Sequence, residues 1–265
     1  MAKVVTLEAI NLAIGYGKGS SAIKIAEGID FALSEGDFAL MLGCNGAGKS
    51  TLLRTLAAVQ QPLSGEVKVC SQDISQITPR ELAQRVSVVF TDKTMAGGLL
   101  VEEVVALGRY PYTGFFGKIS KEDKKIVNSS LLLVGMENKS KKYLSQLSDG
   151  ERQKIMIAKA LAQQTSLIIL DEPTAFLDLP SRIEILYLLK RLASEEGKTI
   201  LLSTHDVEQS LTMADKLLLL KGGEFKFKSV AEAIDSGDVA NMFAERGIEF
   251  DKNSGRFFPK QSDKE

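Results

Sequence analysis

Nine residues near the N-terminus have the types and spacing of a loop that binds nucleotide phosphates. They follow the pattern Gly-x-x-x-x-Gly-Lys-Ser and are Gly43, Cys44, Asn45, Gly46, Ala47, Gly48, Lys49, Ser50 and Thr51. An apolar run at 37–42 and apolar residues at helical spacing at 51–59 predict a strand before the loop and a helix after it. Unpaired N–H groups and the positive end of the dipole make a helix N-terminus favourable for phosphate oxygens. Lys49 adds a cation and Ser50 a hydroxyl for Mg²⁺, so the segment predicts a nucleoside triphosphate site.

Two carboxylates follow directly after an apolar run at 166–170. Asp171 and Glu172 therefore lie at the carboxyl end of a predicted strand, where α/β proteins bind ligands. Asp171 offers the oxygen ligands that Mg²⁺ prefers. Glu172 is suited to polarise the water that attacks a γ-phosphate, as a general base. A solvated strand end is the alternative for an isolated Asp-Glu pair, and the phosphate loop favours the catalytic interpretation.

A second helix start and a histidine are further candidates. Ser148 and Gly150 open a helix expected at 149–163, where they either bind an anion or serve only as a helix cap. His205 is the only histidine among the 265 residues. It follows an expected strand at 199–203, which places it at the same sheet edge as the two carboxylates and lets it donate to a γ-phosphate oxygen. A purely structural histidine is the alternative.

The elements that must position these residues change in kind along the chain. Residues 1 to about 90 alternate short apolar runs with Gly and Pro, which predicts strands at 4–12, 28–33, 38–42, 65–69 and 86–90. Apolar residues three and four apart between 101 and 144 predict an inserted helical subdomain. Further helices are expected at 181–195 and 207–214, and strands at 167–170 and 216–220. This alternation predicts a parallel sheet covered on both faces.

Composition limits the class of protein. The 33 Lys and Arg residues nearly balance the 34 Asp and Glu residues, so no basic surplus points to nucleic acid as a partner. Cys44 and Cys70 are the two cysteines, and Cys44 lies within the phosphate loop, which fits a reducing cytosol. Cys44 is interpreted as a small loop residue, with redox sensitivity as the alternative. The N-terminus lacks the layout of a signal peptide, and no apolar stretch approaches the roughly 20 residues that span a bilayer.

Taken together, the motifs resemble the nucleotide-binding subunit of ATP-binding cassette (ABC) transporters over essentially the whole chain. In this resemblance residues 43–51 are the Walker A motif, 147–151 the signature, 167–172 the Walker B motif, 173–178 the D-loop, and His205 the switch histidine. The resemblance implies that Tyr16 stacks on adenine. It implies that ATP and Mg²⁺ are handled by Lys49, Ser50, Asp171, Glu172 and His205. Ser148 and Gly150 would close over the ATP of a second copy in a head-to-tail dimer.

The resemblance also implies the architecture. We expect an α/β fold of the P-loop NTPase type, with a mixed, largely parallel sheet, an N-terminal antiparallel β subdomain and an inserted helical subdomain. The ATPase domain is expected at residues 1–228, with its catalytic core at 1–90 and 151–228 and the helical subdomain at 91–150. A small appendage is expected at 229–265, with two short helices and then two strands around a turn at 251–255.

Three departures from the family pattern stand out. Thr91 occupies the position where the family has Gln, and we hypothesise that Asp92 or a water replaces the missing amide. Asp149 and Glu151 stand where Gly and Gln are common in the signature, and Cys44 replaces a common Pro. The last two departures are interpreted as tolerable variation.

An aromatic segment of the helical insert points to a subgroup. Residues 108–117 contain four of the chain's 17 aromatic residues, which either pack the subdomain's own core or line a hydrophobic groove for a partner helix. The segment is similar to the Gly-Arg-x-Pro-[His/Tyr] stretch of importers for iron-siderophore complexes, haem and cobalamin. The resemblance therefore implies an ATPase at the cytoplasmic face of the membrane. Its partners would be two permease subunits and, indirectly, an extracytoplasmic binding protein.

Two other classes of protein remain as alternatives. A soluble ABC ATPase that acts on ribosomes, nucleic acid or cluster assembly commonly has two cassettes, a coiled coil or a basic extension, and none of these is evident in the sequence. A phosphate-loop kinase would not need residues 147–151. The transported substrate does not follow from the sequence, because the ATPase does not contact it.

Overall fold

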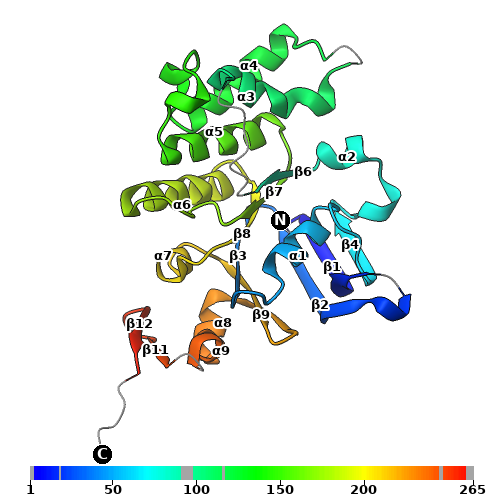
Figure 1. The fold of residues 1–265 in the computed structure, drawn as a ribbon, viewed down its shortest axis with the longest axis vertical. Helices are drawn as coiled ribbons and strands as arrows, with labels where there is room; N and C mark the ends of the chain where they lie inside the picture. Colours follow the sequence, from blue (N-terminus) through cyan, green and yellow to red (C-terminus); the bar gives the residue numbers. More distant parts are fainter. Residues whose placement is uncertain (1–2, 18, 91–97, 115–116, 245–246, 261–265) are drawn as a thin grey trace, which may run out of the picture.

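The computed structural model describes residues 3–17, 19–90, 98–114, 117–244 and 247–260. Its centre is a six-stranded sheet in the order β10-β9-β3-β8-β7-β6 (Figure 1). The strands are β3 (Phe38–Gly43), β6 (Val86–Val89), β7 (Leu167–Asp171), β8 (Thr199–Ser203), β9 (Lys216–Lys221) and β10 (Glu224–Ser229). Neighbours from β9 to β6 are parallel, whereas β10 is antiparallel to β9. The mixed sheet that the sequence implied is confirmed.

Both faces of the central sheet are buried, as β3 illustrates. Successive side chains of a strand point to opposite faces. Phe38 and Leu40 accordingly belong to one hydrophobic cluster, which also contains buried residues of the helical insert. Ala39 and Met41 belong to a second cluster, shared with Leu52 and its helix and with the N-terminal strands. Because both faces are occupied, the polar groups of these strands are left at the strand ends.

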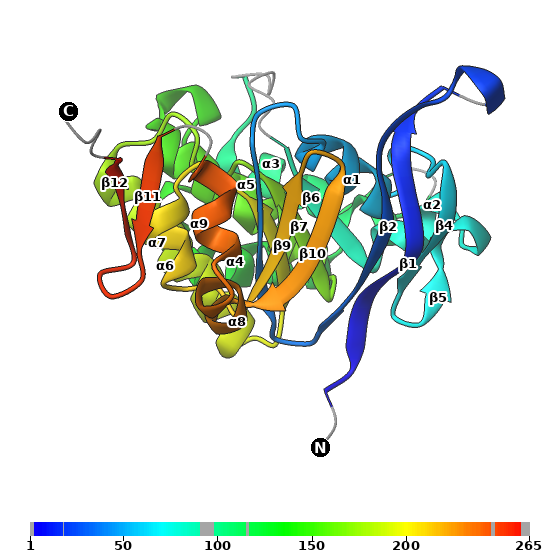
Figure 2. The same cartoon turned by 90° about the horizontal axis from the view of Figure 1, so that it is seen from below.

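The N-terminal strands form a separate antiparallel sheet, in the order β2-β1-β4-β5 (Figure 2). They are β1 (Val5–Tyr16), β2 (Ile23–Ser34), β4 (Ser64–Val69) and β5 (Gln72–Asp73). The predictions for the first two strands, 4–12 and 28–33, were too short. Pairing continues through Gly15↔Lys24 and Tyr16↔Ile23 after register shifts, so β1 carries Tyr16 to the phosphate loop.

One strand of the central sheet was missed by the sequence interpretation. β10 follows β9 through a two-residue turn of Gly222 and Gly223, which have φ angles of 58° and 85°. Two successive positive φ angles suit the tight turns of hairpins, and glycine adopts them without a steric penalty. The sequence did contain a signal for this hairpin: two glycines separate the apolar run of β9 from the run of β10, in which apolar and polar residues alternate.

Helices cover the sheet and form the insert. The insert contains α3 (Val101–Ala106) and α4 (Lys121–Leu133), which pack against α5 (Asp149–Ala162), and the three helices gather at one end of the molecule (Figure 1). The remaining helices before β10 are α1 (Lys49–Leu56), α2 (Pro79–Ala83), α6 (Leu179–Ser194) and α7 (Val207–Leu211). The prediction of 207–214 for the last helix was too long. Within the described residues, no helix has the length and apolar character needed to cross a membrane.

The C-terminal segment contains the predicted helices and hairpin. They are α8 (Val230–Asp235), α9 (Asp238–Phe243), β11 (Ile248–Asp251) and β12 (Arg256–Pro259). Ala233, Val239 and Met242 are buried in the same cluster as Leu217 and Leu219 of β9. The two helices of the segment thus pack on the core that contains the ATPase strands, and the hairpin lies beside α7 (Figures 1 and 2).

Candidate functional site

The phosphate loop connects the end of β3 to α1, with two of its glycines in left-handed conformations. Gly46 and Gly48 have φ angles of 80° and 102°. At Gly48 an added Cβ would lie 2.4 Å from Cγ2 of Ile25, so this position excludes a side chain for two reasons. Gly48 is also the N-cap of α1, which has no side-chain cap. The start of α1 is therefore arranged to bind an anion with its backbone N–H groups.

Lys49 is the cation of this loop. Its ammonium group donates to the carbonyl oxygen of Gly43 at 2.8 Å and lies 3.4 Å from that of Cys44. The residue is only 7% exposed, because its stem packs within the loop. A buried ammonium group held close to the helix start complements a phosphate at that start.

The two predicted carboxylates occupy the end of β7, beside the end of β8. Asp171 pairs in register with Ser203, whose hydroxyl donates to Asp171 Oδ1 at 2.6 Å. The backbone N–H of Glu172 lies 3.1 Å from both the carbonyl oxygen and the hydroxyl of Ser203. Glu172 has a φ of 51°, an uncommon conformation for a residue with a side chain. Such conformations persist where surrounding contacts enforce them, and here Ser203 provides those contacts.

His205 lies against Glu172, as expected for residues that follow neighbouring parallel strands. Its Nε2 is 2.7 Å from Glu172 Oε1. The loop after His205 is fixed by Asp206, whose carboxylate accepts from Thr174 Oγ1 and Arg182 Nη1, both at 2.6 Å. Asp206 thus ties the residue after His205 to Thr174 and Arg182, while His205 itself contacts Glu172.

Tyr16 lies beside the phosphate loop at the end of the long strand β1. Its hydroxyl is 2.8 Å from Oγ1 of Thr51. Tyr16 borders an open cleft of about 580 Å³, whereas residues 43–51 of the phosphate loop are not among its described lining residues. The cleft is lined by Gly15, Tyr16, Gly17, Arg54, Val59, Gln60, Gln61, Phe90 and Asp171. This lining combines an aromatic ring, cationic and amide groups and a carboxylate, which suits a nucleotide.

The signature residues form a complete helix cap. Ser148 Oγ accepts from the backbone N–H of Glu151, and the Glu151 carboxylate accepts from the backbone N–H of Ser148. Lys139 forms an ion pair with the same carboxylate. Gly150 allows Ser181 of α6 to lie close to the start of α5, because an added Cβ at Gly150 would be 2.8 Å from Oγ of Ser181. Ser148 and Gly150 are not among the described residues that line the 580 Å³ cleft.

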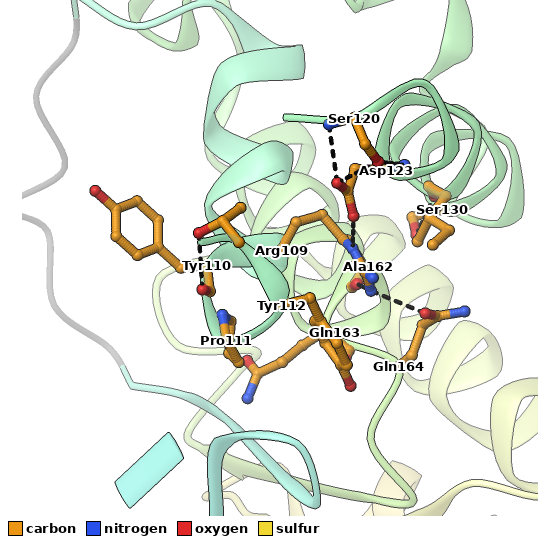
Figure 3. Close-up of polar contacts among 12 residues, drawn as sticks. Arg109, Tyr110, Pro111, Tyr112, Ser120, Asp123, Ser130, Ala162, Gln163 and Gln164 are labelled. Atoms are coloured by element: carbon orange, nitrogen blue, oxygen red, sulfur yellow. Dashed lines mark hydrogen bonds and ion pairs between the residues drawn. The ribbon is translucent and has the colours of Figure 1, made fainter. Parts of the chain in front are cut away.

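The aromatic segment of the insert forms a 3₁₀ helix at Leu107–Tyr112, and its arginine is buried (Figure 3). Arg109 is 5% exposed and donates to Asp123 Oδ1 at 2.8 Å and to the carbonyl oxygen of Ala162 at 2.7 Å. Its guanidinium carbon also lies 4.0 Å from the ring centre of Tyr112. Hydrogen bonds from the Ser120 hydroxyl, followed by that from Arg109, lower the pKa of Asp123 to about 2. The arginine thus ties α4 to the carboxyl end of α5.

The same segment is held from the ATPase core. Arg80 of α2 donates to the carbonyl oxygens of Pro111 and Thr113, at 2.9 and 3.1 Å. Tyr112 donates to the carbonyl oxygen of Gln163 at 2.9 Å, whereas Tyr110 is 66% exposed. Tyr112 thus packs on Arg109 although it is 36% exposed, and Tyr110 faces outward; the groove for a partner helix stays a prediction. The other two aromatics, Phe115 and Phe116, lie outside the described residues.

Some sequence hypotheses fall outside the described residues, and some residues of the site were missed. Thr91 and Asp92 lie outside that part of the chain. Ser203 and Asp206 were not identified from the sequence, and Thr174 only as part of residues 173–178, although Ser203 ends a buried strand at the same sheet edge as Asp171. The rule that identified Asp171, a polar residue at the end of an apolar run, also applies to Ser203.

Comparison with known proteins places the chain in a family. Residues 26–175 match the family described as ABC transporter. The chain is 40% identical over 235 residues to an uncharacterised ABC transporter ATP-binding protein of Methanocaldococcus jannaschii, covering 89% of this chain and 80% of the relative. It is 34% identical over 236 residues to the ferric enterobactin transport ATP-binding protein of Escherichia coli, covering 89% and 86%. It is 33% identical over 234 residues to the iron(3+)-hydroxamate import ATP-binding protein of Bacillus subtilis, covering 88% and 86%.

Solved structures agree with this relationship. An inward-facing metal-chelate type ABC transporter includes a chain that superposes with a TM-score of 0.79 at 28% identity, covering 96% of this chain and 95% of that one. A dimeric ATP-binding cassette bound to ADP and Pi superposes with a TM-score of 0.72 at 28% identity, covering 84% and 98%. The chain belongs to the ABC transporter family. It is an ATP-binding subunit with the ABC ATPase fold, and it hydrolyses ATP to energise transport.

Proposed function

We propose that this chain is the ATPase subunit of an importer for an iron chelate, either a siderophore complex or haem, with cobalamin as a related substrate. The observation that carries the proposal is the similarity, at about one-third identity over most of both chains, to two ATPases named for the transport of ferric chelates. The segment Gly108 to Tyr112 supports it through its similarity to the Gly-Arg-x-Pro-[His/Tyr] stretch of importers for iron-siderophore complexes, haem and cobalamin.

The residues around the phosphate loop divide the work on ATP. The N–H groups at the start of α1 and the ammonium of Lys49 bind the phosphates. Tyr16 stacks on the adenine ring. Glu172 acts as general base on the attacking water, and His205 donates to a γ-phosphate oxygen. The contact between Glu172 and His205 supports this division, because both groups must reach the same phosphate.

Magnesium fits the donor set at the end of β7. Asp171 contributes carboxylate oxygens and Ser50 a hydroxyl, and Mg²⁺ prefers such oxygen ligands. The hydroxyl of Ser203 fixes the Asp171 carboxylate from the neighbouring strand. When bound with ATP, the ion would neutralise charge on the β- and γ-phosphates. We therefore assign Ser50 and Asp171 as the residues that hold it.

A second copy of this chain completes the site. Ser148 and Gly150 would close over the ATP held by the phosphate loop of the other copy, in a head-to-tail dimer. The dimeric arrangement of a similar cassette bound to ADP and Pi supports this assignment.

The remaining partners are two membrane permease subunits, which hold the dimer peripherally at the cytoplasmic face of the membrane, and indirectly an extracytoplasmic binding protein. Purification of the detergent-solubilised complex tests this assignment. We expect a permease to co-purify, and we expect the ATPase activity of the complex to rise when a ferric chelate is added. Recovery on ribosomes without a permease would instead identify a soluble ABC ATPase.

The assignment of the base has a separate test. Glu172→Gln keeps the size of the side chain and removes its basicity, so ATP turnover should fall by a factor of about 100 or more. The affinity for ATP should change little, because Glu172 does not bind the phosphates. Turnover at the parent rate would show that another group is the base.

A further inference from the structure

Two carboxylates follow His205 closely in the chain, and each is anchored to a different part of the molecule. Asp206 is held by Thr174 and Arg182, which belong to the D-loop and α6. Glu208, in the first turn of α7, accepts a hydrogen bond from the backbone N–H of Phe257 at 2.8 Å. The loop that carries His205 therefore lies between a tether to the ATPase core and a tether to the C-terminal hairpin.

The hairpin tether is well defined on the hairpin side. In the described part of the chain β12 pairs with β11 alone, so the outer edge of β12 has no strand beside it. Glu208 supplies a charged acceptor for one N–H group of β12, and hydrogen bonds to charged groups are stronger than neutral ones. The ring of Phe257 packs against those of Phe243 and Phe250, with centroids 4.9 and 4.8 Å apart. These rings fix the N–H group that Glu208 binds.

A hollow between the hairpin and α7 reaches His205 itself. Its volume is about 290 Å³, and it is lined by His205, Asp206, Val207, Glu208, Gln209, Phe243, Ile248 and Phe257. Aromatic and aliphatic side chains of the C-terminal segment thus lie on one side, and the switch histidine and its two carboxylates on the other. The hairpin shapes the surroundings of the histidine as well as holding the helix that follows it.

The C-terminal segment also contacts the phosphate loop. The Sγ atom of Cys44 lies 3.8 Å from the carbonyl oxygen of Met242 in α9, the helix that carries Phe243. Lys221 at the end of β9 donates to the carbonyl oxygen of Asn241 at 2.8 Å. A segment packed on both loops can hold them at a fixed separation, because packed protein interiors resist deformation.

We propose that Glu208 is a positioning residue for His205. Tethered to β12, it fixes the first turn of α7 and so the direction in which the imidazole approaches the γ-phosphate. The C-terminal hairpin is accordingly a part of the ATPase machinery. The inference rests on the proposed role of His205 in the reaction and extends it to a segment that the sequence interpretation treated as an appendage.

The single histidine makes the experiment simple. In the full-length chain prepared without a histidine tag, ¹³C-labelled histidine gives one imidazole signal, which is that of His205. We would compare Glu208→Ala with Glu208→Gln, which keeps an oxygen that accepts the N–H of Phe257. The matched control is Lys252→Ala, which removes the bond from the hairpin to the carbonyl oxygen of Asp235 and leaves the Glu208 tether in place.

The expected result is a displaced His205 signal in Glu208→Ala and a kcat for ATP lowered on the order of tenfold, because a misplaced group loses transition-state contact. The KM for ATP should stay within about twofold of the parent value, since Glu208 is not among the residues assigned to bind the nucleotide. Glu208→Gln and Lys252→Ala should keep both the signal and the kcat of the parent chain.

Three outcomes would overturn the inference. One is an unchanged signal, kcat and melting temperature in Glu208→Ala. Another is an unchanged signal and kcat with a lower melting temperature, which would show that Glu208 only stabilises the fold. The third is a displaced signal with parent kcat, because the tether would then not affect the reaction. A parent chain that does not hydrolyse ATP would contradict the proposed function instead, and the imidazole signals of the variants would still show whether the tether exists.

Discussion

Two helix N-termini, those of α1 and α5, were both expected to bind phosphate, and the structure makes them different. α1 begins at Gly48, which has no side chain to cap the first N–H groups of the helix. α5 begins at Ser148 with a complete capping box, in which Ser148 and Glu151 satisfy each other's backbone N–H groups. The first helix start is open to an anion, and the second is already satisfied within its own chain.

This difference is consistent with the proposed composite site, in which one chain holds only half of the groups that contact ATP. An uncapped helix start has unsatisfied donors, so a phosphate gains hydrogen bonds without displacing a protein group. At α5 an incoming phosphate would compete with the cap, or use the Ser148 hydroxyl in a new direction. ATP should therefore bind first at α1, and closure of α5 of a second copy should follow as a separate, weaker step.

The largest expected effect is at the open helix start. Lys49→Ala removes the ammonium that complements the phosphates at α1, so ATP hydrolysis should fall by a factor of about 100 or more. Steady-state phosphate release measures it. Lys68→Ala, which removes an ammonium from an ion pair with Glu66 on the N-terminal sheet, is the control and should keep the parent rate. Equal rates in the two variants would contradict the assignment of the α1 site.

The next effect is on the backbone of the same helix start. Gly48→Ala should lower the free energy of unfolding by about 3 kcal/mol, because the φ of 102° is strained for alanine and its Cβ would meet Ile25. Urea unfolding measures it. Gly46→Ala is the matched variant, with positive φ but no heavy atom within 4 Å of an added Cβ, and it should cost less. An equal loss in both variants would show that the contact with Ile25 does not matter.

The opposite end of α5 gives a pH-dependent prediction. The lowered pKa of Asp123, about 2, against an ordinary value of 3.8, stabilises the folded state above pH 3.8, and this contribution is lost as the pH falls towards 2. Asp123→Asn should therefore cost about 2 kcal/mol of unfolding free energy near neutral pH, and progressively less below about pH 4. Denaturant titrations at several pH values measure the difference.

The control for this prediction is Glu122→Gln in the same turn of α4. Glu122 forms an exposed ion pair with Lys125, and exposed pairs contribute little to stability. The difference between this variant and the parent should be small at every pH. A constant penalty for Asp123→Asn across the acid range would show that the carboxylate charge does not stabilise the joint between α4 and α5.

The smallest effect is at the capped helix start. Ser148→Ala should lower the unfolding free energy by about 1 kcal/mol through loss of the cap. Ser229→Ala is a close match, because Ser229 forms the same type of capping box with Glu232 at the start of α8. Both variants should lose similar stability, but only Ser148→Ala should lower ATP hydrolysis. Parallel losses of activity in the two would contradict a contact of Ser148 with nucleotide.

Most of the fold followed from local patterns in the sequence. The apolar runs before Gly43 and Asp171 became buried strands, and the helical spacing after 101 became the insert. The errors concern pairing between distant segments: β1 continues to Tyr16 because β2 pairs with it there, and β10 exists because the Gly222-Gly223 turn folds it onto β9. Strand ends depend on such partners, and a local pattern does not contain the partner.

The candidate site shows the same division. Residue types and spacing predicted the phosphate loop and the paired carboxylates, because these motifs are contiguous and each requires particular chemical groups, whereas His205 also needed its place after a strand and the resemblance to the family. The structure alone decided that Ser203 holds Asp171, that His205 contacts Glu172, and that Phe257 holds Glu208. Those contacts join residues 32 to 49 positions apart in the chain, and the first of them lies across the neighbouring strands β7 and β8. Short sequence motifs thus determine which chemical groups the candidate site contains. The orientation of these groups comes from contacts that exist only after the sheet and the C-terminal segment have packed.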